Sequence, residues 1–389
     1  MVDRIQKLSK SNDLFLFGAR GTGKSTLIHS VFDSFRVLWI DLLTEESEER
    51  FGRHPDELSR HLAGAAYDYV VIDEIQKNPK LLDVIHSIIE TKKKRPYFIL
   101  TGSSARKLKR DGANLLGGRA FTYHLFPFTH QELGTHFNLN EVLQFGSLPL
   151  AVQFETDDKK EAFLRGYVRS YLKEEILVEQ IVRQIEPFKD FLEVAAQMNG
   201  EIINYAKISR DVGVSDQTVK SFYSILEDTL VGVSLMPFHR SIRKRQREAP
   251  KFYIFDTGVK RALSREIKIP LHPGTSEFGR AFESFMILEI FRACEYLQND
   301  FRLSYLRTKD DVEIDVIMER PGQKDLLLEI KSASRVTDDD VRSLKRFLGD
   351  WDRPVEAHVW SLDPLEKKIE GVHCLPWQIG FKTVFGEIL

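Results

Sequence analysis

Few cysteines and no long apolar run are the clearest absences in this sequence. Only Cys294 and Cys374 occur among 389 residues, which excludes a disulfide framework and a zinc ribbon and suits a reducing compartment. No apolar run approaches the ~20 residues that cross a bilayer. The polar start Met1–Lys10 does not have the pattern of a signal peptide. We therefore expect a cytoplasmic protein with no membrane partner.

The sequence also lacks a strong net charge. It has 56 basic and 58 acidic residues, for a formal net charge of −2. Any contact with nucleic acid must therefore come from local basic patches. A chain of 389 residues is too long for one ordinary core, so two or three domains are expected.

Residues 18–25 read Gly-Ala-Arg-Gly-Thr-Gly-Lys-Ser, a complete phosphate-binding loop pattern between an apolar run and a helix-like run. Its backbone N–H groups would point at phosphate oxygens. Lys24 would reach the β- and γ-phosphates, and the Ser25 hydroxyl would help to hold Mg²⁺. The pattern predicts ATP and Mg²⁺ as cofactors. The predicted nucleotide contacts are Gly18, Ala19, Arg20, Gly21, Thr22, Gly23, Lys24, Ser25 and Thr26.

The apolar run Tyr69–Ile72 ends in Asp73 and Glu74, which is the Walker B pattern. Consecutive apolar residues suit a parallel strand covered on both faces. Asp73 would bind Mg²⁺, directly or through water, and Glu74 would orient and polarise the attacking water. Two acidic residues after a strand could otherwise simply begin a loop.

Two further runs predict strands of the same sheet. Residues 36–42 are interpreted as another central strand, and residues 96–100 as a strand that ends in the polar cluster 101–104. A strand inserted between the phosphate-binding-loop strand and the Walker B strand marks the additional-strand class of P-loop ATPases. Ser103 or Ser104 is the candidate γ-phosphate sensor, although either could instead cap a helix that begins near Ala105.

Arg119 follows a Leu-Leu-Gly-Gly turn and precedes the apolar strand 121–126. Its guanidinium could act as a finger on the γ-phosphate of a neighbouring subunit. That role would make the protein a homo-oligomer. Arg119 could equally be a structural anchor.

These motifs resemble prokaryotic AAA-type ATP-binding proteins, which pair an ATPase domain with a C-terminal domain of unknown function. The resemblance rests on residues 18–25, 73–76, 101–104 and 116–119, and spans nearly the whole chain. Phe126-Pro127-Phe128 and Gln131-Glu132-Leu133 also fit. The usual Gly-Gly-Tyr-Pro is Gly-Ser-Leu-Pro at 146–149, which weakens an adenine contact for Pro149.

The middle of the chain predicts helices followed by two strands. Residues 159–183 are interpreted as one long amphipathic helix. Residues 205–212, the Gly213 turn and a helix capped by Ser215 form a helix-turn-helix pattern. Strand-like runs at 231–236 and 251–255 would complete a winged helix. The basic wing Arg240–Arg247 would contact nucleic acid, DNA in preference, although a solvated hairpin or an acidic protein partner would also explain it.

The C-terminal part predicts a helix at 277–297, strands at 303–306, 312–318 and 326–331, a helix at 338–348 and a strand at 355–360. This αβββαβ order is that of a restriction-endonuclease-like core. Asp315 and Glu329 could converge on Mg²⁺ or Mn²⁺, with Glu283 completing the carboxylate set. Lys331 lies two residues beyond Glu329 and would share its strand face, where it could orient or deprotonate water.

The predicted fold is therefore α/β with three modules. These are an N-terminal P-loop AAA-type ATPase at 1–155, a helical and winged-helix module at 156–270, and a restriction-endonuclease-like domain at 271–389. The predicted function is ATP hydrolysis coupled to nucleic-acid engagement, with metal-dependent cleavage or simple grip by the last domain. The alternative is a nucleotide-dependent switch that acts on a protein partner and uses a non-catalytic C-terminal scaffold. A metabolic kinase is disfavoured because the sequence shows no pattern typical of a pocket that binds a phosphate acceptor.

Overall fold

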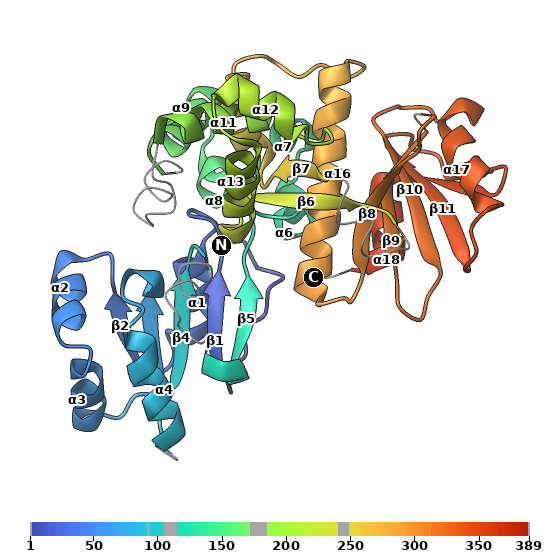
Figure 1. The fold of residues 1–389 in the computed structure, drawn as a ribbon. Helices are drawn as coiled ribbons and strands as arrows, with labels where there is room; N and C mark the ends of the chain where they lie inside the picture. The colour runs from blue at the N-terminus through green and yellow to red at the C-terminus, as the bar shows by residue number, and fades with distance from the viewer. Residues whose placement is uncertain are drawn as a thin grey trace. The chain divides into compact units, whose positions relative to one another are not determined.

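The computed structural model describes residues 2–91, 94–104, 116–171, 185–239, 249–310 and 312–387. Contacts divide the chain into two compact units, one of residues 1–128 with 225–231 and one of residues 129–224 with 232–389 (Figure 1). Each unit is described by itself below. The three-module boundaries at 155/156 and 270/271 stay predictions.

The N-terminal unit is built on a five-stranded parallel sheet with the order β2-β3-β4-β1-β5. Its strands are β1 (Asp13–Phe17), β2 (Val37–Asp41), β3 (Tyr69–Asp73), β4 (Tyr97–Gly102) and β5 (Ala120–His124). Its α-helices in the described ranges are α1 (Lys24–Phe32), α2 (Glu45–Arg53), α3 (Glu57–Gly64) and α4 (Leu81–Thr91). This parallel sheet confirms the predicted α/β class of the N-terminal part.

Alternation along the strands gives this sheet two apolar faces. Phe15 and Phe17 of β1 pack into one cluster with Ile85 and Ile88 of α4. Leu14 and Leu16 pack into the other with residues of α1 that include Ile28 and Phe32. Successive side chains of a strand point to opposite faces, so a fully apolar strand indicates a sheet covered on both sides.

The strand order confirms one prediction and corrects another. β4 lies between β1 and β3, as the additional-strand class requires. β2 is an edge strand and not a central one. Its first three residues are only partly buried, so its apolar sequence did not distinguish an edge position from a central one.

The part of the second unit before the C-terminal sheet is mainly helical. Its α-helices in the described ranges are α6 (His130–Leu133), α7 (Leu139–Phe145), α8 (Pro149–Gln153), α9 (Asp157–Gly166), α11 (Ile185–Gln197), α12 (Tyr205–Val212), α13 (Asp216–Asp228) and α15 (Thr257–Leu263). The last four residues of α13, 225–228, belong to the first unit. The predicted long helix 159–183 changes to a π-helical turn at Tyr167–Tyr171, and residues 172–184 lie outside the described ranges.

The helix-turn-helix segment contains the predicted elements. Gly213 ends α12 with a φ of 73°, and Ser215 Oγ accepts the Thr218 N–H at 3.1 Å before α13. Two antiparallel strands follow, β6 (Gly232–Pro237) and β7 (Lys251–Ile254). The predicted basic wing, Arg240–Arg247, lies outside the described residues, and the winged-helix assignment stays a prediction.

The C-terminal sheet has eight strands in the order β12-β13-β11-β10-β9-β8-β6-β7. It therefore includes the two strands predicted for the middle module. The remaining strands are β8 (Arg302–Arg307), β9 (Glu313–Glu319), β10 (Asp325–Lys331), β11 (Val355–Ser361), β12 (Lys367–Ile369) and β13 (Val372–Pro376). Residues 276–361 contain the predicted order of helix, three strands, helix and strand.

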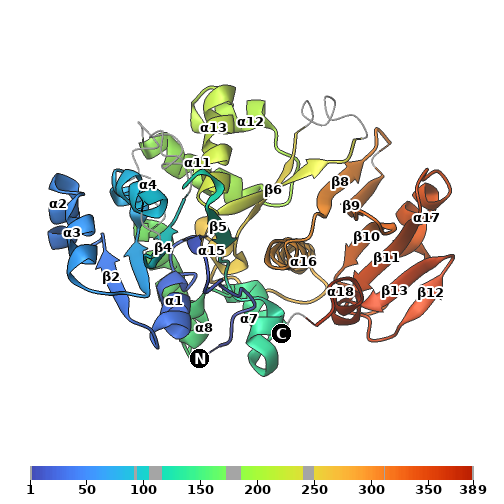
Figure 2. The ribbon, with the colours of Figure 1, turned by 90° about the horizontal axis from the view of Figure 1, so that it is seen from below.

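Helices cover this C-terminal sheet. The long α16 (Ser276–Leu297) contacts β10 and is seen end-on beside the strands in Figure 2. An apolar cluster joins β9, β10 and β11 to α17 (Arg342–Leu348). The chain continues to a further helix, α18 (Trp377–Phe385). The sheet thus holds residues of α16, β9 and β10 on one stable framework.

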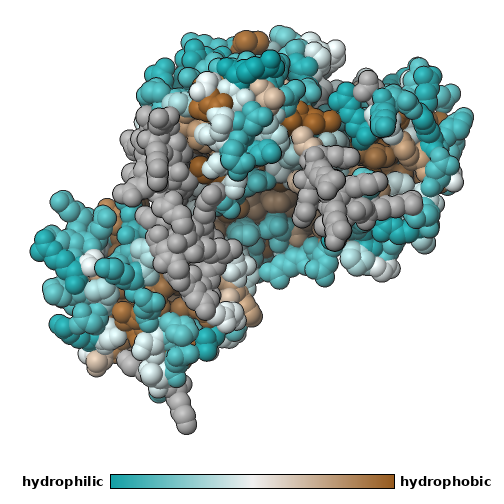
Figure 3. Space-filling model, in the orientation of Figure 1, coloured by the Kyte–Doolittle hydropathy of each residue, from teal (hydrophilic) through white to brown (hydrophobic). Residues whose placement is uncertain are grey.

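The described surface carries hydrophilic side chains where the helices face solvent. In Figure 3 this is clear over the charged α2 and α3, and Phe51 is the buried residue of α2. Within the described ranges, none of the helices has both the length and the apolar character needed to span a membrane. Cys294 and Cys374 are free thiols and both are buried.

Candidate functional sites

The phosphate-binding loop lies between β1 and α1 and has the backbone that its glycines predict. Gly21 and Gly23 have φ values of 81° and 93°, in the left-handed region that glycine adopts without strain. Gly18 is fixed for a different reason, since a Cβ there would lie 2.4 Å from the Leu125 carbonyl oxygen. Thr22 Oγ1 donates to the Ala19 carbonyl at 2.8 Å and closes the loop.

The reactive side chains of the loop face the end of β3. Lys24 is buried, donates to the Gly18 carbonyl oxygen at 2.8 Å and lies 3.9 Å from Glu74 Oε1. Ser25 Oγ donates to Asp73 Oδ2 at 2.9 Å. Thr26 and Arg20 are exposed, and Ala19 is buried. The fold thus brings Lys24, Ser25, Asp73 and Glu74 together, although Ser25 is 48 residues from Asp73 in the chain.

Glu74 has a backbone conformation that is unusual for its residue type. Its φ and ψ are 59° and 50°, in the left-handed region that a non-glycine residue rarely adopts. Such conformations cost free energy and concentrate at functional sites. Here the turn carries the second carboxylate past the strand end while its N–H still has a partner, Thr101 Oγ1, at 3.1 Å.

Two residues of this site were not predicted as site residues. The Thr101 hydroxyl donates to Asp73 Oδ1 and accepts the Glu74 N–H. Gln76 Nε2 donates to Glu74 Oε2 and to Ser103 Oγ, the latter at 3.1 Å. Both residues stood inside the motifs 73–76 and 101–104. Their contacts depend on β3 and β4 being neighbours. The expected pairing of these two strands was the feature of the sequence that could have indicated Thr101 and Gln76 as site residues.

The sensor candidates lie at the end of β4 and are fully buried. Ser103 is connected to Glu74 through the Gln76 amide. Gly102 lies beside that amide, and a Cβ there would lie 2.5 Å from Gln76 Oε1, so a larger residue would displace the Gln76 side chain. The helix that Ser103 or Ser104 could cap lies within residues 105–115, outside the described residues.

Arg119 lies on the exposed surface of its own domain. Its Nη2 donates to Glu90 Oε1 at 3.0 Å, and its Nη1 is 3.2 Å from His86 Nε2. Glu90 and His86 are both on α4. These contacts are those of an anchor between the β5 connection and α4, and the finger role stays a prediction.

The Gly146–Pro149 segment has a packing role in the second unit. The Ser147 N–H donates to Asp256 Oδ2 at 2.7 Å. A Cβ on Gly146 would lie 1.9 Å from Asp256 Oδ1. Asp256 also caps α15 through the Val259 N–H at 3.0 Å. The tight approach therefore requires glycine at position 146.

The second group of predicted site residues comes from α16, β9 and β10. Asp315 Oδ2 accepts the Ile330 N–H at 2.7 Å, which ties β9 to β10. Lys331 Nζ donates to Glu329 Oε1 at 2.6 Å, in agreement with the shared strand face. Glu283 Oε1 accepts the Tyr253 hydroxyl at 2.9 Å. We call Glu283, Glu313, Asp315 and Glu329 the carboxylate cluster.

Burial and mutual repulsion raise the pKa values of two carboxylates in this cluster. Burial raises the pKa of Asp315 to about 7, with Glu283 adding to the rise. Burial likewise raises the pKa of Glu329 to about 8, with Asp315 adding to it. Glu329 Oε2 is buried and has no hydrogen-bond partner. A buried carboxylate oxygen without a partner is costly, so a further cation or hydrogen-bond donor beside Glu329 Oε2 would be stabilising.

Lys251 of β7 is a member of this site that the sequence analysis missed. It is 5% exposed. Its ammonium forms an ion pair with Glu313 and lies 3.5 Å from Glu283 Oε1. Burial opposes its charge, but Glu283 and Glu313 outweigh that effect and raise the pKa of Lys251. It lies far in the sequence from the predicted pair Glu329 and Lys331, so only strand pairing brings it here.

Across the described ranges, no three carboxylate, histidine or cysteine side chains are placed together as a ready metal-binding group. Basic and hydroxyl groups hold three of the four carboxylates of the cluster. Lys331 holds Glu329 Oε1, Lys251 holds Glu313, and Lys251 with Tyr253 holds Glu283.

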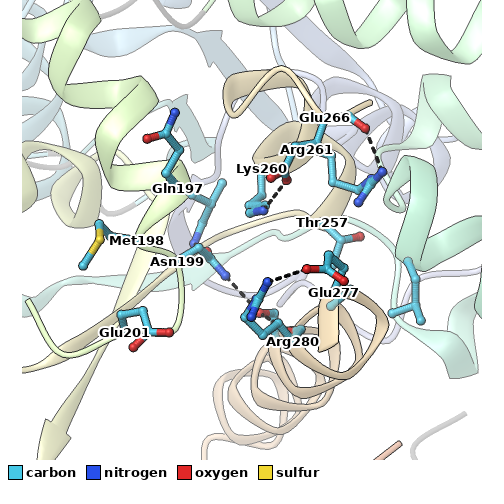
Figure 4. Close-up of a pocket in the computed structure, with 14 residues that line it drawn as sticks. Gln197, Met198, Asn199, Glu201, Thr257, Lys260, Arg261, Glu266, Glu277 and Arg280 are labelled. Carbon is cyan, nitrogen blue, oxygen red and sulfur yellow. Dashed lines mark hydrogen bonds and ion pairs between the residues drawn. The ribbon is translucent and has the colours of Figure 1, made fainter. Parts of the chain in front are cut away.

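A separate cavity of about 280 Å³ lies among α15, α16 and the end of α11 (Figure 4). Its charged side chains pair with one another, Lys260 with Glu266 at 2.7 Å and Arg280 with Glu277 at 3.0 Å. Asn199 Nδ2 donates to Ser284 Oγ at 2.9 Å. Asp315, Glu329 and Lys331 are not among its lining residues in the described chain.

Family models match three consecutive parts of the chain. Residues 10–134 match the AAA domain. Residues 136–268 match a domain of unknown function (DUF8612), and residues 278–378 match another (DUF4143). With its parallel sheet and its loop geometry, the N-terminal part is an AAA-type domain. That class indicates ATPase activity and implies a nucleotide with Mg²⁺.

Three similar proteins are each described as uncharacterized. An uncharacterized protein of Mycobacterium tuberculosis is 26% identical over 317 residues, which are 81% of this chain and 69% of that protein. A protein of Mycobacterium bovis has the same values. An uncharacterized protein of Haemophilus influenzae is 21% identical over 293 residues, 70% of this chain and 68% of its own length. Function must therefore be argued from the sites.

Proposed function

We propose that this protein hydrolyses ATP at the N-terminal site and uses that cycle to engage nucleic acid, DNA in preference. The carboxylate cluster would then act on, or grip, the bound strand. The single observation that carries the ATPase part is the convergence of Ser25 and Thr101 on Asp73, next to Lys24 and Glu74. The AAA match of residues 10–134 supports it independently.

The roles at the ATPase site follow from these contacts. Lys24, which now donates to a loop carbonyl, would turn to the β- and γ-phosphates. Mg²⁺, held by Ser25 and Asp73, would neutralise charge on those phosphates. Glu74 would hold the attacking water and accept its proton. Gln76 donates hydrogen bonds to both Glu74 and Ser103. A movement of Ser103 caused by the γ-phosphate would therefore shift Glu74, the proposed general base.

The ATPase part has a direct test. Glu74→Gln keeps the size of the side chain and removes its basicity, so we expect hydrolysis to fall by roughly a hundredfold while ATP binding persists. Single-turnover hydrolysis and calorimetry measure the two quantities separately. Hydrolysis at the wild-type rate would contradict the assignment of Glu74.

Nucleic-acid engagement is supported by the helix-turn-helix segment and by the basic run Arg240–Arg247. The run has five basic residues among eight, a charge density suited to a phosphate backbone. α13 carries acidic Glu227 and Asp228 toward its C-terminal end, which argues against strong sequence-specific readout. The expected contact is therefore largely independent of sequence.

The carboxylate cluster is our proposed site for a divalent cation, although its side chains are not gathered as a ready metal-binding group in the described chain. Carboxylate oxygens are the ligands that Mg²⁺ and Mn²⁺ prefer, and Glu329 Oε2 is a buried oxygen that lacks a partner. Asp315 and Glu329, with Glu283, would hold the ion, which would stabilise charge on the scissile phosphate. Lys331 would orient the attacking water from its place beside Glu329.

Stimulation of ATP hydrolysis by duplex DNA across a salt series tests the engagement. We expect stimulation that falls steeply with salt, because phosphate contacts release counterions. No stimulation at any salt concentration would favour the alternative, a nucleotide switch that acts on a protein partner.

Cleavage has its own test, in a nuclease assay with Mg²⁺ or Mn²⁺ under three conditions: ATP, a non-hydrolysable analogue and no nucleotide. Lys331→Ala should abolish cleavage and spare ATP hydrolysis. If Lys331→Ala cuts DNA as fast as the wild type, the assigned nuclease site is wrong.

A further inference from the structure

A lysine from a different strand is built into the carboxylate cluster. Lys251 begins β7 and pairs in register with Leu235 of β6. Its ammonium reaches Glu313 of β9 and Glu283 of α16. It also lies 5.6 Å from the centre of the Tyr305 ring. A lysine that is 5% exposed needs such partners, since an unpaired buried charge is strongly destabilising.

The same strand holds Glu283 by a second group. Tyr253, two residues after Lys251 and completely buried, donates its hydroxyl to Glu283 Oε1 at 2.9 Å. The two contacts converge on the same oxygen of Glu283, Oε1. Glu329 differs, because its Oε2 is buried and has no hydrogen-bond partner.

We infer that Lys251 is a tethered counter-ion that competes with a divalent cation for Glu283 and Glu313. The inference rests on the metal site proposed above. With Lys251 in place, Glu283 is withheld from the ligand set and the cluster offers Asp315 and Glu329. When Lys251 withdraws, Glu283 joins them and the cation replaces the ammonium. Binding of metal and the seating of Lys251 therefore oppose each other, and this linkage is reciprocal.

Mn²⁺ binding to the full chain tests this competition. All proteins carry Asp73→Asn, which silences the N-terminal metal position, and free Mn²⁺ is measured by its EPR signal. Lys251→Met removes the charge and keeps an apolar side chain of similar length. We expect Mn²⁺ to bind about tenfold more tightly, since a like charge within a few ångströms is lost from a buried site. Lys251→Arg keeps the charge and should keep the wild-type affinity.

Matched variants separate this effect from general charge removal. Lys345, paired with Glu370 on the surface of the same domain, gives the control Lys345→Met, which should leave Mn²⁺ affinity unchanged. Adding Glu283→Gln to Lys251→Met should cancel most of the gain, because the freed ligand is then missing.

A second experiment uses the wild-type protein, so its result does not depend on whether a variant folds. An amine-acylating reagent, followed by mass spectrometry, should label Lys251 faster with Mn²⁺ than without, while Lys345 is labelled equally. Equal Mn²⁺ affinities of Lys251→Met and Lys345→Met, or Mn²⁺-independent labelling of Lys251, would overturn the inference alone. If Asp315→Asn removes none of the measured Mn²⁺ binding, both the inference and the proposed metal site are wrong.

Discussion

The two candidate sites both bring carboxylates together, but they surround them with different partners. At the N-terminal site Asp73 is satisfied on both oxygens by neutral hydroxyls, Ser25 and Thr101. At the C-terminal site the carboxylates face one another and two lysines, and Glu329 Oε2 is left without a partner. The hydroxyl donors add no net charge around Asp73. At the C-terminal site, burial and then the neighbouring carboxylates raise the pKa of Asp315 and of Glu329.

The strongest way to separate the sites is to disable one and measure both. Lys24→Ala removes the ammonium beside the loop and should weaken ATP binding at least about a hundredfold, measured by calorimetry. Mn²⁺ binding at the carboxylate cluster should persist. Lys80→Ala, an exposed residue of the same unit, is the control. Wild-type ATP affinity in Lys24→Ala would refute the phosphate-binding role of the loop.

A second experiment tests whether the hydroxyls around Asp73 matter. Thr101→Val keeps the side-chain shape but leaves Asp73 Oδ1 and the Glu74 N–H without this partner. We expect kcat for ATP to fall about tenfold or more, since hydrogen bonds to charged groups contribute about 1.5–3 kcal/mol. Thr101→Ser retains the hydroxyl and should restore most of the rate. If Val and Ser behave alike, the hydroxyl is not part of the mechanism.

The pH dependence of stability should report the buried carboxylates of the C-terminal site. Asp315 and Glu329 have folded pKa values of about 7 and about 8, above their unfolded values near 4. Between these limits the folded state binds more protons than the unfolded state. Their contribution to the free energy of unfolding is therefore fully present below about pH 4 and lost as pH rises through 7 to 8.

Asp315→Asn removes part of this dependence. Denaturant unfolding of the wild type and the variant, compared from about pH 5 to pH 8, should show a smaller decline of stability in the variant. Parallel declines in the two proteins would contradict the raised pKa of Asp315.

The smallest effect is expected at Arg119. Its pair with Glu90 is exposed on both sides, so Arg119→Ala should cost at most about 0.5 kcal/mol of stability. ATP hydrolysis should stay within about twofold, as expected for an anchor on α4. A loss of about a thousandfold would instead indicate an arginine finger that acts between subunits.

Most of the N-terminal site could be predicted from the sequence because its motifs are contiguous. A glycine pattern dictates backbone geometry locally, and an apolar strand that ends in Asp73-Glu74 dictates a carboxylate at the sheet edge. The roles of Thr101 and Gln76 could not be predicted from local patterns, since each role depends on which strand lies beside β3. The edge position of β2 was misjudged for a related reason, as apolar content does not fix strand order.

At the C-terminal site the sequence predicted the elements and four residues, Glu283, Asp315, Glu329 and Lys331, from their spacing. It did not indicate Lys251, which is 32 residues from Glu283 and 64 from Asp315. β7 joins the sheet through β6 and β8, a long-range pairing that no local pattern encodes.

What the sequence determined by itself is the set of short-range constraints: where glycine must turn the backbone, where a strand is buried, and which charged residues share a strand face. Only the tertiary structure decided which of those charges meet. Local geometry follows from neighbouring residues, whereas the free energy of a buried charge depends on every group packed around it. For Asp73 that surrounding is a pair of hydroxyls, and for Glu283 it is Lys251 and Tyr253.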